Sequence, residues 1–311
     1  MVRGFAPTTI RGYASLLARV LARFDRPVWE IGPEEVDVMV RDLVAQGRAP
    51  GTRRLYVQAL RSFLEFLRER HETEIYTRFG VRPGNPVDRY NRVRHTGDDS
   101  PRVPVPPTVE RVAAFFAFAR DQVATAEDYR AAARDYAVLR TLYHSGVRVS
   151  ELVRLDRCDV HVAQGASGRL HVRFGKAANA SGPRPRFTPM LDGLDRVLAW
   201  YLADVRPLFP GTTTLFSDPD GAPLKPETVR DRLARLLDLE AGPASERFAP
   251  HALRRACATH NYERGMDLVA VQHLLGHRHI ASTMAYVKPS ARFVEDAWQR
   301  ATATALTALA S

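Results

Sequence analysis

Residues that can act on a phosphodiester gather toward the C-terminal end of the sequence. His251 stands three positions before Arg254, His277 ends a Leu-Leu-Gly-His segment, and Tyr286 follows it. An arginine offers a planar pair of donors that fits two phosphate oxygens, and a phenol can attack phosphorus. The set therefore predicts chemistry on the phosphodiester backbone of DNA without a metal ion.

Taken one at a time, these residues have simpler interpretations. A lone histidine at a helix start is more often a cap or a surface residue, and a lone tyrosine on a helix usually belongs to the core. His273 and His277 lie four positions apart and could form a zinc pair, but there is no His-Glu-x-x-His pattern. We therefore expect no metal, and the assignment depends on the spacing of the whole set.

A second motif lies much earlier, where residues 146–152 read Gly-Val-Arg-Val-Ser-Glu-Leu. The glycine predicts a helix junction at which the guanidinium of Arg148 can point into a groove. The simpler alternative is an ion pair between Arg148 and Glu151 one turn later. The two interpretations are compatible, since Glu151 could orient Arg148.

Together, Arg148, His251, Arg254, His277 and Tyr286 resemble the signature of the tyrosine recombinases, the phage integrase family, in the right order over most of the chain. The resemblance implies that Tyr286 attacks a DNA phosphate, forming a 3′-phosphotyrosine bond and freeing a 5′ hydroxyl. It also implies that the two arginines stabilise the charge of the transition state. Because the covalent bond conserves the energy of the phosphodiester, we expect no cofactor and no ATP.

The family also uses a lysine to protonate the leaving 5′ oxygen, and Lys176 is the match. It is one of three lysines, with Lys225 and Lys288, and it lies between two predicted strands. Relatives usually show a short Gly-Lys-Gly turn, whereas this chain continues Gly-Lys-Ala-Ala-Asn-Ala-Ser-Gly-Pro. That departure makes Lys176 the assignment that depends most on the resemblance.

Composition agrees with a DNA-acting protein. The chain has 311 residues, 45% of them hydrophobic, a net charge of +10 and a pI near 10.0, which favours two domains and a polyanionic partner. Two cysteines are too few for a disulfide framework or a zinc ribbon. No apolar run approaches the ~20 residues of a membrane span. We expect a cytoplasmic, nucleoid-associated protein with no membrane partner.

Residues 1–92 are predicted to form a helical core-DNA-binding domain. Helices are expected from a cap at Thr8 or Thr9 to about Phe24, from 33 to about 47, and from 52 to 70. Its DNA-facing residues are predicted to be Arg53, Arg54 and Arg61, the alternative being a solvated helix face. The buried stripe of the third helix is predicted to be Leu55, Leu60, Phe63, Leu64 and Leu67.

Residues 93–107 are rich in arginine and proline and are expected to be a linker. Residues 108–311 are predicted to form the catalytic domain. It should contain helices over 108–124 and 127–144, strands over 170–174 and 186–188, and then helices almost to the end. The expected fold is mainly α, with a helical domain followed by a mostly helical catalytic domain that carries a small antiparallel sheet.

The resemblance further implies double-stranded DNA with paired inverted half-sites and a tetramer at synapsis. A further partner could be a second recombinase or an accessory protein. The C-terminal helix could dock on a neighbouring subunit or pack against its own subunit. Because the core-binding helices come almost first, we expect no arm-site-binding domain, as in simple Xer-like recombinases. The alternatives are a type IB topoisomerase or telomere resolvase, and a catalytically inactive DNA-binding regulator.

Overall fold

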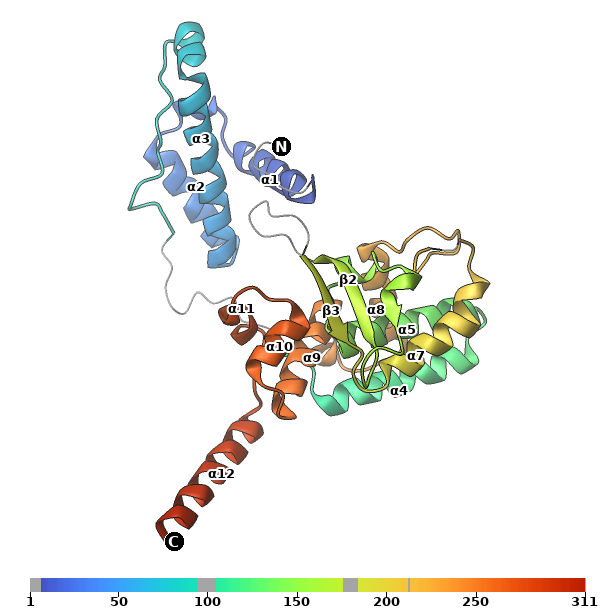
Figure 1. The fold of residues 1–311 in the computed structure, drawn as a ribbon. Helices are drawn as coiled ribbons and strands as arrows, with labels where there is room; N and C mark the ends of the chain where they lie inside the picture. Colours follow the sequence, from blue (N-terminus) through green and yellow to red (C-terminus); the bar gives the residue numbers. More distant parts are fainter. Residues whose placement is uncertain (1–6, 94–104, 176–183, 212, 311) are drawn as a thin grey trace. The chain divides into compact units, whose positions relative to one another are not determined.

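The computed structural model describes residues 7–93, 105–175, 184–211 and 213–310. Contacts divide the chain into two compact units, each with a hydrophobic core of its own. The first contains α1 to α3 and the segment that follows them, and the second contains α4 to α12 (Figure 1).

The first unit is helical, as predicted. It consists of α1 (Pro7–Leu21), the short helix η1 (Val28–Glu30), α2 (Pro33–Ala45) and α3 (Pro50–Phe79). Prolines at the first turn begin α2 and α3, where the missing N–H costs no helical hydrogen bond. The core is formed by Val36, Met39 and Leu43 of α2 and by the buried face of α3.

α3 differs from the prediction in length and in its buried face. It spans 30 residues and ends at Phe79, and its C-cap residue Gly80 adopts the left-handed conformation with φ 70°. Leu55 is 56% exposed, whereas Tyr56, Val57, Leu60 and Leu64 are buried. At about 100° per residue, Leu55 lies on a different face from Leu60, so the two leucines cannot share one stripe. The placement of Leu55 in the core was wrong.

α1 also departs from the expected pattern at its start. The helix begins at Pro7, so Thr8 and Thr9 lie within it and do not cap it. It ends at Leu21, before Phe24. Ile10 and Tyr13 are exposed and Val20 is fully buried, so only the last turns of α1 contribute strongly to the core.

The second unit is mostly helical with one small sheet, which confirms the expected fold class. Its elements in chain order are α4 (Val109–Thr125), α5 (Tyr129–Ser145), α6 (Val149–Leu152), η3 (Arg157–Asp159), β1 (Val160–His161), β2 (Arg169–Gly175), β3 (Arg184–Pro189), α7 (Leu194–Trp200), η4 (Tyr201–Val205), η5 (Arg206–Leu208), α8 (Pro226–Leu239), η6 (Ala244–Glu246), α9 (Pro250–Glu263), α10 (Leu268–Leu275), α11 (Ile280–Met284) and α12 (Ala291–Ala310). Side chains of Thr108 and Asp128 cap α4 and α5, close to where the sequence predicted these helices to begin.

The sheet is antiparallel with strand order β1-β2-β3. Figure 1 shows β2 and β3 side by side. The sequence predicted β2 and β3 but not β1, which has only two residues and therefore shows no alternation. Along β2, Leu170 and Val172 are buried, so one face of the sheet packs on the core. β3 pairs with β2 in a register that places Arg186 opposite Val172.

α5 is the central helix of this unit and packs against α4, α7, α8 and α9. It ends at Ser145, and the C-cap residue Gly146 is left-handed with φ 62°. A Cβ at this position would also lie 2.9 Å from Cδ2 of Leu275. Glycine therefore allows both the sharp turn and the close approach of α10, and the chain enters α6 with Arg148 at its N-terminus.

After Pro289 the chain forms α12, as predicted. Phe293 packs on Tyr262 of α9, with ring centroids 5.5 Å apart, while Trp298 is 69% exposed. Within the described parts of the chain, no helix has both the length and the apolar character needed to cross a membrane.

Candidate active site

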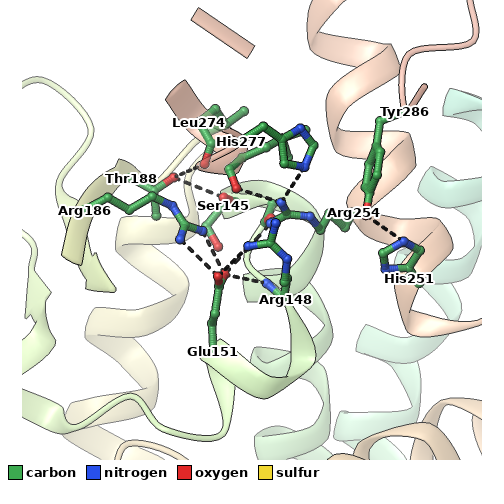
Figure 2. A network of polar contacts seen from close by, with 12 residues as sticks. Ser145, Arg148, Glu151, Arg186, Thr188, His251, Arg254, Leu274, His277 and Tyr286 are labelled. Carbon is green, nitrogen blue, oxygen red and sulfur yellow. Dashed lines mark hydrogen bonds and ion pairs between the residues drawn. The ribbon is translucent and has the colours of Figure 1, made fainter. Parts of the chain in front are cut away.

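A buried carboxylate lies at the centre of the predicted arginine cluster (Figure 2). Glu151 is 3% exposed and accepts hydrogen bonds from the backbone N–H of Arg148 at 2.9 Å and from its Nη1 at 2.7 Å. Both interpretations of the motif are thus compatible with the geometry, since the ion pair with Glu151 also fixes the orientation of Arg148. The Arg148 side chain keeps 21% of its surface exposed, so a phosphate can reach it.

Arg186 on β3 completes this cluster, and sequence reasoning missed it. Its Nη1 and Nη2 donate to the two oxygens of Glu151 at 3.1 and 2.8 Å. The alternation of residues along β3 could have indicated it, because Arg186 and the fully buried Thr188 lie two positions apart and so share one face of the strand. An arginine on the core-facing side of a strand requires a buried acidic partner.

The charge balance of the cluster remains positive. Burial alone would raise the pKa of Glu151, but the hydrogen bonds and charges of Arg186 and Arg148 outweigh burial and lower the pKa to about 2. Arg254 lies 3.9 Å from the same carboxylate. Three guanidinium charges against one carboxylate leave an excess of two positive charges, which suits a phosphate.

Arg254 lies deeper than Arg148, with 1% of its side chain exposed. Its Nη1 donates to the carbonyl oxygen of Gly146, and its Nη2 donates to that of Leu275 at 2.6 Å. Its Nε–H is buried and has no hydrogen-bond partner among the residues that the structure describes. Burial, followed by the positive charge of Arg148, lowers the pKa of Arg254 to about 10, so it stays charged at neutral pH.

His277 follows the C-cap residue Gly276, as the sequence predicted. Gly276 has φ 65°, and an added Cβ would lie 2.7 Å from Cδ of Arg186. Because an arginine can only donate, the 3.1 Å contact from Arg254 Nη2 makes Nε2 of His277 the acceptor. Its Nδ1 then carries the proton and donates to Oγ1 of Thr283 at 3.0 Å. Burial and the charge of Arg254 lower the pKa of His277 to about 3, which keeps the ring neutral.

Tyr286 lies just beyond the end of α11 and not within a helix. Its Oη is 2.9 Å from Nε2 of His251, at the first turn of α9 (Figure 2). The ring centroid is 4.7 Å from that of His277 and 5.7 Å from Cζ of Arg254. Burial and the charges of Arg255, Arg254 and Arg148 lower the pKa of His251, so its neutral ring can accept the phenolic proton.

Five of the predicted catalytic residues therefore lie in one cluster, and the sixth is not described. Lys176 falls outside the described residues, between the end of β2 at Gly175 and the start of β3 at Arg184. Among the residues that the structure describes, no group of three His, Cys, Asp or Glu side chains could hold a metal ion.

Two of the three arginines predicted to face DNA line one groove of the first unit. Arg54 and Arg61 of α3 lie with Arg89 and Arg92 around a groove of ≈ 970 Å³. Arg61 is also held by Glu65, with a 2.8 Å contact between Nε and Oε1. Arg53 does not line this groove, and its Nε is buried without a hydrogen-bond partner in the described parts of the chain.

Comparison with known proteins identifies the family of this chain. The phage integrase family matches residues 118–292. The chain is 34% identical over 316 residues to the tyrosine recombinase XerC of Methylobacterium sp. (strain 4-46), covering 96% of this chain and 88% of that protein. It is 35% identical over 162 residues to the tyrosine recombinase XerD of Staphylococcus saprophyticus, covering 50% of each.

Solved structures show the same fold. The XerH site-specific recombinase bound to a palindromic difH substrate has a TM-score of 0.69 at 18% identity, covering 91% of this chain and 77% of that one. A lambda integrase dimer bound to a COC′ core site has a TM-score of 0.66 at 18% identity, covering 93% and 92%. The chain therefore belongs to the phage integrase family and is a tyrosine site-specific recombinase.

Proposed function

We propose that the protein cleaves and rejoins double-stranded DNA through a 3′-phosphotyrosine bond to Tyr286. The phenolic oxygen attacks the scissile phosphorus while its proton passes to Nε2 of His251, 2.9 Å away. The new bond joins Oη to phosphorus, and the bond from phosphorus to the 5′ oxygen breaks. The observation that carries this proposal is the contact between a phenol and a neutral histidine beside three arginines.

The arginines would stabilise the phosphate as charge spreads over its non-bridging oxygens. Arg148 has the most exposed side chain of the three arginines and would make the first contact. Arg254 lies deeper and adds its positive charge. Fixed donors in a partly buried site stabilise developing charge without reorganisation, which is the role that a metal ion fills in other phosphoryl-transfer enzymes.

The departing 5′ oxygen needs a proton, and we assign its donation to Lys176 on the basis of the family resemblance. Rejoining reverses the step, with a 5′ hydroxyl attacking phosphorus and Tyr286 leaving. Since one phosphate ester replaces another in each direction, the cycle needs no ATP.

The first unit would hold the DNA. We propose that residues 1–92 form a core-binding domain, 93–107 a linker and 108–311 the catalytic domain. The groove is lined by Arg54, Arg61, Arg89 and Arg92 with Asp88 as the one acidic residue, so its lining is basic and suits a phosphate backbone. XerH and lambda integrase are seen bound to DNA sites in their structures, which supports a duplex as the partner here.

Recombination joins two duplexes, so we further propose paired inverted half-sites and a tetramer at synapsis. The exposed Trp298 on α12 leaves part of the C-terminal helix open to a neighbouring subunit. Deleting residues 290–311 should then impair recombination more than cleavage. Equal loss of both activities would count against subunit coupling through this helix.

The test is to express the protein in its host, stop the cells with SDS and sequence the DNA that stays covalently attached, with Tyr286→Phe alongside. The proposal predicts enrichment of one locus with paired inverted half-sites by the wild type alone. Sequence-specific crosslinking without an adduct from either form would contradict cleavage and favour a DNA-binding regulator. An adduct that relaxes supercoils without joining duplexes would favour a topoisomerase.

A further inference from the structure

One face of α9 carries three residues that contact the segment around Tyr286. His251, Arg255 and Thr259 are spaced four positions apart, which aligns them along one side of a helix. His251 contacts the phenolic oxygen at 2.9 Å. Thr259 Oγ1 donates to the backbone oxygen of Tyr286 at 3.5 Å and accepts from the backbone N–H of Lys288 at 3.2 Å. This face therefore holds Tyr286 at its oxygen and at its backbone.

Arg255 lies in the middle of that face and covers the ring. Its Cζ is 4.8 Å from the ring centroid of Tyr286, and its Nη1 donates to the carbonyl oxygen of Ala285 at 3.5 Å. Arg254 is more distant, at 5.7 Å, and its terminal nitrogens already donate to the carbonyls of Gly146 and Leu275. Arg255 is thus the closer of the two cations on the ring.

The position of Tyr286 in the chain explains why such a contact matters. The residue follows the end of α11, so its own backbone is not held by a continuing helix. His251 and His277 contact the ring edge to face, with centroids 5.3 and 4.7 Å away. Attack on phosphorus requires the oxygen within a few tenths of an ångström of its productive position, so small movements of the ring are costly.

We propose that Arg255 is a positioning residue for the nucleophile: its guanidinium clamps the Tyr286 ring against α9 and keeps Oη at Nε2 of His251. The clamp combines a cation–π contact with the hydrogen bond to Ala285. This inference rests on the proposed role of Tyr286 as the nucleophile.

The test compares Arg255→Ala, Arg255→Lys and the wild type in single-turnover cleavage at saturating DNA. The probe is a nicked duplex with the sequence recovered covalently by the wild type. A cation–π contact of ordinary strength predicts cleavage about three- to thirtyfold slower in Arg255→Ala, with partial rescue by Lys. Arg278→Ala is the matched control, since it removes an exposed arginine from the loop before α11 and should leave the rate at saturation unchanged.

A second readout needs no DNA. In protein labelled at its tyrosine rings, the Tyr286 resonance is identified by its loss in Tyr286→Phe. The clamp predicts that this resonance moves toward that of a free tyrosine in Arg255→Ala and stays near its wild-type position in Arg255→Lys. This readout reports the docking of the ring even if the protein forms no covalent adduct.

The outcomes separate the two proposals. A wild type that never forms an adduct overturns the nucleophilic role, while the resonance still decides whether Arg255 positions the ring. If the wild type cleaves and Arg255→Ala matches it in rate and in resonance, the clamp is wrong. Equal slowing in Arg255→Ala and Arg278→Ala would also overturn it, because the effect would then be a general loss of positive charge.

Discussion

Replacing Glu151 by glutamine keeps the shape of the side chain at the centre of the arginine cluster and removes its charge. Burial by itself raises the pKa of this carboxyl, but the contacts from Arg186 and Arg148 lower it from the ordinary 4.5 to about 2. One pKa unit corresponds to about 1.4 kcal/mol, so ionisation of Glu151 contributes about 3 kcal/mol to folding. We expect Glu151→Gln to lower the free energy of unfolding by about that amount at pH 7.

The pH dependence of this difference follows from the direction of the shift. The pKa is lower in the folded protein, so the stabilisation is complete above about pH 4.5 and is lost as the pH falls toward about 2. The gap in unfolding free energy between the wild type and Glu151→Gln should therefore be constant near neutral pH. It should narrow progressively below pH 4.5.

The assay is urea unfolding at a series of pH values, followed by the fluorescence of Trp200. Phe in place of Trp29 and Trp298 leaves Trp200 to report on the unit that contains the cluster. Glu227→Gln is the control, because Glu227 forms an exposed ion pair with Arg230, and solvent screening leaves such a pair little effect on stability. A Glu151→Gln protein as stable as the wild type at pH 7, or a gap that does not change with pH, would refute the reasoning.

Three further predictions follow from the two units. Alanine at both Arg54 and Arg61 should weaken DNA binding and reduce the slope of log K against log salt by about 2, at roughly 0.9 per phosphate contact. Fluorescence anisotropy of labelled DNA over a series of salt concentrations measures this slope. An unchanged slope would mean that the DNA-facing surface lies elsewhere. Because the pKa of His277 is lowered in the folded protein, its contribution to stability is complete above pH 6.5 and is lost as the pH falls toward 3. His277→Gln should therefore lose less unfolding free energy than the wild type between pH 7 and pH 4. An equal loss in the two proteins, measured by urea unfolding, would contradict a neutral His277 ring. Gly146→Ala should lower the free energy of unfolding by roughly 1–3 kcal/mol, since it combines φ 62° with a 2.9 Å approach to Leu275. Gly265→Ala also has a positive φ but its added Cβ meets open space, so it should lose less unfolding free energy in the same urea assay.

Most residues of the candidate site could be predicted from the sequence because they lie in short motifs. Arg254 follows His251 by one helical turn, and Gly276 provides the left-handed residue that turns the chain before His277. Local spacing fixes such relations. The tautomer of His277 could not be predicted, because it depends on Arg254 and Thr283, which meet only in the folded protein.

Long-range pairing is what the sequence did not reveal. Arg186 reaches Glu151 across 35 positions, through the pairing of β2 with β3 and the packing of that sheet on the core. Arg255 is adjacent to Arg254, but its contact with the Tyr286 ring depends on how α9 meets the segment after α11. The buried face of α3 was missed for a simpler reason, since Leu55 is hydrophobic but lies off the helical stripe.

The most direct test of the central claim is to map the covalent attachment by mass spectrometry. The adduct is digested with nuclease and trypsin, and the peptide of residues 279–292, which contains Tyr286, is examined for a nucleotide. The account predicts a nucleotide joined through its 3′ phosphate to Tyr286, a 5′ hydroxyl on the other DNA end, and no such peptide from Tyr286→Phe. A nucleotide on another residue, a linkage through the 5′ phosphate, or an adduct that persists in Tyr286→Phe would contradict it.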